Sequence, residues 1–309
     1  MDLYYWKSPK GNFGDDLNEW LWDRLLPGWR DWDQGTTLVG VGTILNVNHF
    51  PPERPGRFLV VGSGVGNGPP PDISDGLRWD IQCLRGPRSA RALGLDASMG
   101  VLDPAIMIAD MPEFQQQSKN GPVIFIPHIS SVDLFDWPRI CGQAGIEFVS
   151  PCDDSVQVIT RIASASVVLA ESMHAAIIAD AVRTPWIAVR VSSTFNAAKW
   201  QDWADSLEID LTIRSLMPLT SLLSDPIGRK RRAVELGRTK SPGAASDPAA
   251  GRRLSWKRKL RILLERKLAI SAMRRMTKRP RQLSDPAVLE RHLARYRGIL
   301  NTIMRTYAS

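Results

Sequence analysis

Two histidines stand where a side chain could carry out acid–base chemistry. His128 follows the apolar run Val123–Ile126 after one proline, and His174 comes a few residues after the apolar run Val167–Leu169. Imidazole changes its charge nearer to neutral pH than any other side chain, so it can give or take a proton there. Ligands of open parallel sheets bind at the carboxyl ends of the strands. Two histidines at equivalent strand ends therefore predict a catalytic pair, whereas one alone would indicate a half-buried core residue.

Three other segments offer groups that bind anions. Arg85 follows the strand-like run Ile81–Leu84, and a guanidinium there can hold a carboxylate or a phosphate through two parallel hydrogen bonds. The loop Gly62-Ser63-Gly64 follows another apolar run and could bring backbone N–H groups to a phosphate, although it lacks the spacing of a dinucleotide-binding fingerprint. Ser172 opens the turn before a helical stretch. Each group alone also fits a simpler role, namely a surface ion pair, a tight turn or a helix cap.

Two further segments suit the binding of a sugar. Lys199 stands beside Trp200 and close to Trp203, and a cation with two indoles is suited to stacking on a sugar ring. Core packing is the alternative for these indoles, because the chain has 11 tryptophans. Near the start of the chain, Asn12 and Asp15 lie in a Gly-Asp turn, and we expect Asp15 to be the N-cap of a helix.

The sequence does not predict a metal site. Glu171 stands three residues before His174, a spacing that carboxylate-bridged metal sites use on helices, but no second pair of this kind occurs. The chain has only three cysteines, and none of them forms a CxxC pair. This count argues against a zinc site and a disulfide framework, and it fits a reducing cytoplasm.

The elements that must position these side chains follow an α/β pattern. Up to about residue 225, short apolar runs such as Leu3–Trp6, Arg57–Val61 and Trp186–Val191 alternate with helix-like stretches. This alternation predicts parallel βαβ units. A polar stretch at Gln115–Gly121 suggests a hinge between two halves. We therefore expect two Rossmann-like domains, at residues 1–118 and 119–224.

The charge distribution separates a C-terminal part from this body. The chain has a net charge of +8, yet the segment Arg229–Arg281 alone holds 19 Lys and Arg against three acidic residues. Composition predicts a linker at residues 225–255 and a basic amphipathic helical extension at 256–309, whose last helix begins near Pro286. That helix has an apolar stripe that we expect to pack on the body, formed by Leu289, Leu293, Tyr296, Leu300 and Ile303.

A basic amphipathic extension suits an anionic membrane surface. The start of the chain lacks the features of a signal peptide, and no apolar run approaches the ~20 residues of a membrane span. We therefore expect a cytoplasmic protein that is peripheral on the inner face of the membrane. A solvated, disordered tail is the alternative.

In their order along the chain, these segments resemble the polysaccharide pyruvyl transferase family. The similarity runs from about residue 3 to 210, and it is carried by Asn12–Asn18, Gly62-Ser63-Gly64, Leu84–Arg88, Asp103-Pro104, Ile126–His128 and Glu171–His174. The resemblance implies a GT-B-like arrangement of two Rossmann-like domains around a cleft. It also implies phosphoenolpyruvate as co-substrate, with no cofactor, and a cyclic pyruvate ketal as the product on a hexose of a lipid-linked exopolysaccharide unit.

The resemblance also assigns roles to residues. It places His174 with the donor, and we expect His174 to be the acid–base group and His128 to orient or deprotonate the acceptor. Some members of the family have arginine where Ser172 stands, so the donor carboxylate is expected to be held by another cation, Arg85 or Lys199. The remaining expected contacts are Gly62, Ser63, Gly64 and Ser172 to the donor, and Asn12, Asp15, Trp200 and Trp203 to the acceptor.

Three other functions compete with this interpretation. A GT-B-type glycosyltransferase that uses a nucleotide sugar would have the same two-domain shape. A nucleic-acid-binding protein could use the basic tail, but Trp256 is the only aromatic residue between Arg229 and Arg281, and base stacking needs aromatic side chains. We therefore expect no nucleic acid partner. A non-catalytic adaptor remains open if Ser172 and Ala175, which depart from the family's pattern, mark a lost donor site.

Overall fold

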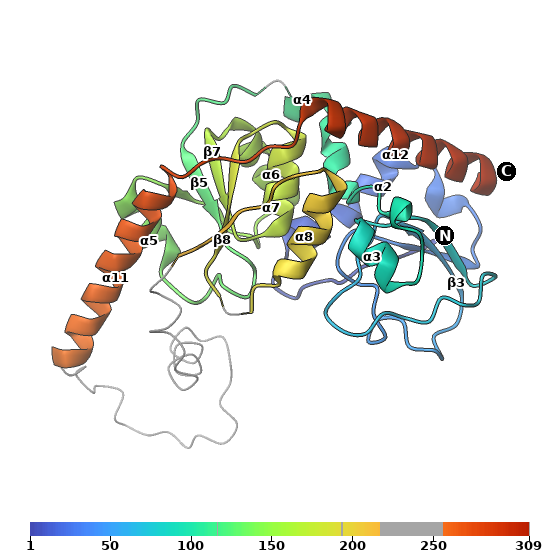
Figure 1. Cartoon of the computed structure of the whole chain (residues 1–309), viewed down its shortest axis with the longest axis horizontal. Helices are drawn as coiled ribbons and strands as arrows, with labels where there is room; N and C mark the ends of the chain where they lie inside the picture. The colour runs from blue at the N-terminus through green and yellow to red at the C-terminus, as the bar shows by residue number, and fades with distance from the viewer. Residues whose placement is uncertain (116, 193, 217–255, 309) are drawn as a thin grey trace, which may run out of the picture.

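The protein is an α/β structure with two parallel sheets, as the sequence predicts. A computed structural model describes residues 1–115, 117–192, 194–216 and 256–308, and the side chains of residues 256–263 and 265 lie outside this description. One sheet has four strands in the order β1-β2-β3-β4, and the other has five in the order β6-β5-β7-β8-β9. Figure 1 labels β3 of the first sheet and β5, β7 and β8 of the second. All strand pairs in both sheets are parallel.

The first sheet is built from the N-terminal apolar runs. Its strands are β1 (Asp2–Tyr4), β2 (Thr36–Val39), β3 (Arg57–Val61) and β4 (Trp79–Cys83). The helical segments of this half are α1 (Phe13–Asp16), η1 (Leu17–Glu19), α2 (Leu21–Leu25), η2 (Trp29–Asp31), α3 (Pro87–Ala92), η3 (Ala97–Met99), η4 (Pro104–Asp110) and α4 (Pro112–Gln115). The predicted run Arg57–Val61 matches β3 at both ends, because its apolar side chains are buried on both faces of the sheet.

The second sheet is built from the second half of the chain. Its strands are β5 (Val123–Ile126), β6 (Glu147–Phe148), β7 (Val167–Ala170), β8 (Trp186–Arg190) and β9 (Ile213–Ser215). The helices of this half are α5 (Trp137–Ala144), α6 (Ser155–Ser164), α7 (Met173–Ala181) and α8 (Ala197–Ser206). All four residues of the central strand β7 and all nine residues of α7 are buried. An all-round apolar helix is typical of the inside of a protein, so α7 is held between other elements.

Two long helices complete the described chain. Helix α11 (Trp256–Met276) packs on α5 in the second half, whereas α12 (Pro286–Tyr307) runs along the first half (Figure 1). The apolar stripe predicted on the last helix is buried, which confirms that it packs on the body. Tyr296 donates from its hydroxyl to the carbonyl of Val61 at 2.9 Å, so α12 is tied directly to the first sheet. The predicted linker at 225–255 lies outside the described residues.

One core joins the two halves. The main cluster of buried apolar side chains includes Phe13 and Ala105 from the first half together with Met173 and Ala176 from the second. Helix η4 packs directly against α7. The predicted boundary at residue 118 falls between the two sheets, but the halves meet through a continuous apolar contact. Among the described residues, no helix combines the length and the apolar character that crossing a bilayer requires.

Candidate active site

The residues of the candidate site follow the carboxyl ends of strands in both sheets. Asp15 lies on the connection after β1, and Asp103 lies beyond β4 in the first half. His128 follows β5 and His174 follows β7, while Lys199 stands in the first turn of α8, after β8. Parallel strands present these connections at one edge of each sheet, and the shared core brings the two edges together.

His174 packs against the backbone of α1. Its ring is so close to Gly14 that a Cβ atom added there would lie 2.0 Å from Nδ1. Any residue other than glycine at position 14 would therefore displace the imidazole. The N-terminal Asn12–Asp16 segment and the histidine motif are therefore in direct contact.

Asp103 faces the other nitrogen of the same ring. Its Oδ1 accepts a hydrogen bond from the backbone N–H of Ala105 at 3.0 Å, which caps η4. Its Oδ2 lies 4.0 Å from His174 Nε2. Neither of these two atoms has a hydrogen-bond partner in the described part of the chain. The site therefore contains two buried polar atoms that are directed toward one another.

Burial shifts the pKa values of this pair in opposite directions. It raises the pKa of Asp103 to about 6, against the opposing effect of the Arg85 guanidinium. Burial is also the main cause that lowers the pKa of His174 to about 3, and Lys199, Arg85 and His128 contribute to the same shift. Burial disfavours the charged form of each group. At neutral pH the imidazole is therefore neutral.

Asp15 is not the helix cap that the sequence predicts, and it lies among the groups of the candidate site. Helix α1 begins at Phe13 after the N-cap Asn12, so Asp15 lies inside the helix. The Asn12 side-chain amide donates to Asp15 Oδ2. Burial raises the pKa of Asp15 to about 7, and the charge of Lys199 is the main effect that opposes this shift. A carboxyl group with such a pKa can exchange a proton near neutral pH.

Lys199 supplies a cation to the site. Among the described residues its ammonium has no hydrogen bond or ion pair. The nearby carboxyl groups of Asp15, Glu171 and Asp103 raise its pKa through their charge. Burial lowers its pKa to about 8, and Arg85 lowers it further. An ammonium that is largely desolvated and unpaired is a suitable partner for an anionic ligand.

His128 is close to the other site groups but less buried than His174. Burial lowers its pKa to about 4, and Lys199 adds to this effect. Its backbone N–H donates to Glu171, whose carboxylate also accepts from the N–H groups of Val191 and Ser192. Glu171 thus holds together the ends of β5, β7 and β8. No cluster of His, Cys, Asp or Glu in the described ranges is arranged to hold a metal ion.

Arg85 is not available to a donor in this structure. Its side chain has no exposed surface and forms an ion pair with Asp202 of α8 at 3.0 Å. A second hydrogen bond runs from its Nη1 to Thr43 at 2.7 Å. Asp202 also accepts from the backbone N–H groups of Arg88 and Ser89. Arg85 therefore links the two halves, and of the two cations expected to hold the donor carboxylate only Lys199 has no ion pair among the described residues.

The glycine loop supports Arg85 and is not a phosphate cradle. Gly62 donates its N–H to Cys83, and Gly64 donates its N–H to Gly42. Ser63 donates its hydroxyl to the carbonyl of Gly40. A Cβ atom at Gly64 would lie 2.2 Å from the central carbon of the Arg85 guanidinium. The predicted role in donor binding is wrong for the N–H groups of both glycines, because they are already used within the fold.

The two tryptophans expected to stack on a sugar are core residues. Trp200 and Trp203 both have 0% exposed surface, and they pack with Trp186. Neither ring has a face free for an acceptor, so the prediction is corrected. Ser172 stands at the N-cap of α7 and is buried, but its hydroxyl makes no capping hydrogen bond. The simpler role considered for this serine is therefore not observed.

The structure thus brings together His128, His174, Asp15 and Lys199, places the paired Arg85 beside them, and leaves the two indoles in the core. Sequence reasoning missed Asp103 as the partner of His174, and it missed Gly14 as the residue that makes room for the ring. The Asp-Pro pair after the apolar Val101-Leu102 was the available signal for Asp103. For Gly14 no local signal existed, since the contact spans the two halves.

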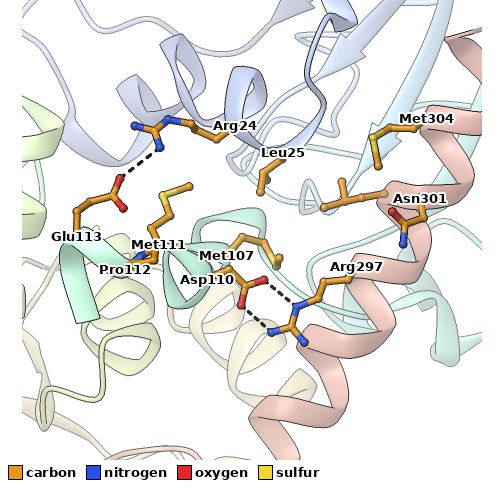
Figure 2. A pocket seen from close by; sticks show the side chains of 11 residues that line it. Arg24, Leu25, Met107, Asp110, Met111, Pro112, Glu113, Arg297, Asn301 and Met304 are labelled. Atoms are coloured by element: carbon orange, nitrogen blue, oxygen red, sulfur yellow. Dashed lines mark hydrogen bonds and ion pairs between the residues drawn. The ribbon is translucent and has the colours of Figure 1, made fainter. Parts of the chain in front are cut away.

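A separate hollow lies away from this site. It measures about 320 Å³ and is bordered by α2, η4, α4 and α12 (Figure 2). The ion pairs Arg24–Glu113 and Arg297–Asp110 flank it, and methionines line part of its wall. It contains none of the histidines or lysines described above, so we assign the chemistry to the site at the strand ends.

Comparison with known proteins identifies relatives of this chain. The model of the family described as "Polysaccharide pyruvyl transferase" matches residues 77–193, which include Asp103, His128 and His174. The chain is 39% identical over 318 residues to the "Succinoglycan biosynthesis protein ExoV" of Rhizobium meliloti (strain 1021), with 99% of this chain and 100% of the relative covered. No solved structure matches.

Proposed function

This chain belongs to the polysaccharide pyruvyl transferase family, and from that premise we propose that it transfers the pyruvyl group of phosphoenolpyruvate to a hexose. The product is a cyclic ketal that bridges two hydroxyl groups of the sugar. The relative named for succinoglycan biosynthesis supports an exopolysaccharide acceptor, and we place the reaction on its lipid-linked repeat unit. The two parallel sheets with apposed strand ends support a GT-B-like arrangement.

One observation carries this proposal: an unpaired ammonium lies among groups that can exchange protons. Lys199 can bind the carboxylate or the phosphate of the donor, since it has no ion pair among the described residues. Asp15 and the Asp103–His174 pair stand around it. Anion binding and proton transfer are the two requirements of the reaction.

In the reaction, both sugar hydroxyls become bonded to the carbon that carries the phosphate, and the phosphate leaves. The methylene carbon takes a proton, and the neighbouring carbon becomes electrophilic. A sugar hydroxyl attacks this carbon, the bond to the phosphate oxygen breaks, and the second hydroxyl closes the ring. The two hydroxyls release two protons, of which one is equivalent to that gained by the methyl group and the other leaves with the phosphate. No redox step occurs.

The site residues fit these steps in distinct roles. We assign proton donation at the methylene carbon to His174, which stands at the centre of the site. Asp15, whose pKa lies near 7, accepts a proton from the acceptor hydroxyl, and Asn12 orients its carboxylate. His128, whose pKa is lowered to about 4, is neutral near pH 7 and orients the acceptor by a hydrogen bond. Ser172, whose hydroxyl does not cap the helix, is placed to contact the donor.

Binding and transfer can be tested together. Phosphoenolpyruvate is expected to raise the melting temperature of the wild-type protein and to fail to do so in Lys199→Met, because the variant lacks the unpaired cation. The exposed Lys7, paired with Glu19, offers the control Lys7→Met, which should behave like the wild type. Incubation with phosphoenolpyruvate and a pool of lipid-linked oligosaccharides should then yield the mass of an added ketal. Stabilisation by a nucleotide sugar instead, without ketal formation, would favour the glycosyltransferase.

Helix α11 is the surface that we propose for peripheral contact with the inner face of the membrane. Its buried residues, Ala269, Ala272 and Met273, face the body. Leu264 and Leu268 are 53% and 40% exposed, and the basic Lys267 lies between them. Apolar side chains flanked by Lys and Arg suit an anionic bilayer, where each basic residue contributes about 1 kcal/mol.

Deletion of the tail would not test this contact, because α12 belongs to the core. We instead predict that the triple variant Leu264→Ser, Lys267→Glu, Leu268→Ser loses most of its flotation with vesicles that contain anionic lipid. The control combines Leu77→Ser and Arg305→Glu, which remove an exposed leucine and a basic residue elsewhere. Equal flotation of the wild type and the triple variant would contradict the proposed membrane surface.

A further inference from the structure

Two polar atoms at the centre of the site are buried without a partner. Asp103 has no exposed surface and His174 only 8%, and their facing atoms Oδ2 and Nε2 are both unsatisfied in the described part of the chain. A buried polar atom without a partner destabilises the folded protein. The two atoms lie 4.0 Å apart, and hydrogen bonds of catalytic groups are often long until the substrate is bound.

The orientation of the ring leaves one nitrogen for proton exchange. The backbone of Gly14 covers the Nδ1 side of His174, because a Cβ atom added to this glycine would lie only 2.0 Å from that nitrogen. Nε2 points toward Asp103. An oxygen placed about 2.8 Å from both Nε2 and Oδ2 would complete a triangle with ordinary hydrogen-bond lengths. Nε2 is thus the nitrogen that can meet both the carboxyl group and a substrate.

We propose, on the basis of the proposed function, that Asp103 is a positioning residue that shares one proton with His174, so that the pair works as a single acid–base unit. The shared proton passes from Nε2 to the methylene carbon of the donor, and the pair is left without it. A proton released by the acceptor hydroxyl then returns to the pair, so the unit is restored within one turnover.

The charges around the pair indicate how the donor would move this proton. At mildly acidic pH the proton lies on Asp103, whose pKa is about 6, and not on His174, whose pKa is about 3. The groups that face the pair are Arg85, Lys199, Asp202, His128, Asp15 and Tyr296. Burial, together with the cations among them, keeps the imidazole neutral. An anionic donor beside Lys199 would offset their charge and favour transfer of the proton to His174.

The variant Asp103→Asn tests this role. Its amide oxygen can still accept from the Ala105 N–H, so the cap of η4 is kept. We expect kcat to fall roughly 10²–10⁴-fold while KM for phosphoenolpyruvate stays within about threefold. The amide cannot stabilise an imidazolium, so His174 loses its proton at lower pH than in the wild type. The alkaline limb of the kcat profile should therefore move toward acid by about one pH unit or more.

A matched control and a second readout separate this role from a structural one. Asp96 caps η3 in the same way, by accepting from the Ser98 N–H at 2.8 Å, and Asp96→Asn should leave the profile unchanged. In the free protein, the ¹⁵N shifts of His174 should follow the titration of Asp103 between about pH 4 and 8 and should be flat in Asp103→Asn. An unmoved kcat limb, or shifts that are the same in both proteins, would overturn the proposal. Absence of transfer by the wild type would refute the proposed function, while the ¹⁵N titration would still decide whether the pair shares a proton.

Discussion

Replacing His174 by alanine is expected to lower pyruvyl transfer roughly 10²–10⁴-fold, the usual contribution of a general acid or base. The imidazole lies between α1 and Asp103, and its Nε2 faces the Asp103 carboxyl group. The measurement is the rate of ketal formation at saturating phosphoenolpyruvate. Circular dichroism and thermal unfolding should show a folded protein, because alanine is compatible with the helical backbone of α7.

The control for this variant is another histidine in a comparable environment. His49 is partly buried, has a lowered pKa through burial, and is hydrogen-bonded to the Tyr4 hydroxyl at 2.8 Å. It takes no part in the proposed reaction, so His49→Ala should keep turnover near the wild-type rate. Near-wild-type turnover in His174→Ala would remove the histidine from the mechanism.

The largest loss of stability is expected from Asp202→Ala. This change leaves the guanidinium of Arg85 buried and unpaired, and it removes the acceptor of the Arg88 and Ser89 N–H groups. Breaking a buried ion pair by removing one partner costs about 3–5 kcal/mol. The free energy of unfolding, measured by urea titration, should fall by about this amount. Because Arg85 and Asp202 come from different halves, their separation should also disturb transfer.

A neighbouring ion pair on the same helix provides the comparison. Asp205 pairs with Arg88 at 2.6 Å, but the arginine side chain is 53% exposed. Exposed pairs contribute about 0–1 kcal/mol, so Asp205→Ala should have little effect on unfolding. A similar loss of stability in both variants would mean that burial does not set the contribution of the Arg85–Asp202 pair to the free energy of unfolding.

The sequence by itself determined the α/β class and the positions of several strands, but not those of the short strands β6 and β9. The runs Arg57–Val61, Val123–Ile126 and Trp186–Val191 are apolar on both faces, and such runs must be buried in a parallel sheet. Because polar residues after these runs lie at strand ends, His128 and His174 could be placed at one edge of the second sheet. The stripe of the last helix was also readable, since a period of about 3.6 residues defines a face whatever that face packs on.

Only the tertiary structure decided which of the candidate groups are free to react. Arg85 and Asp202 are 117 residues apart, and nothing local shows that each neutralises the other. Trp200 and Trp203 would suit a sugar or a core equally well until their burial is known. Gly14 and Asp103 acquire their meaning from the ring of His174, which the second half places between them. The physical reason is that the spacing of apolar residues, which predicts helices and strands, is set by residues close together in the sequence. The pairing of a charged group and its loss of contact with water depend on residues from distant parts of the chain.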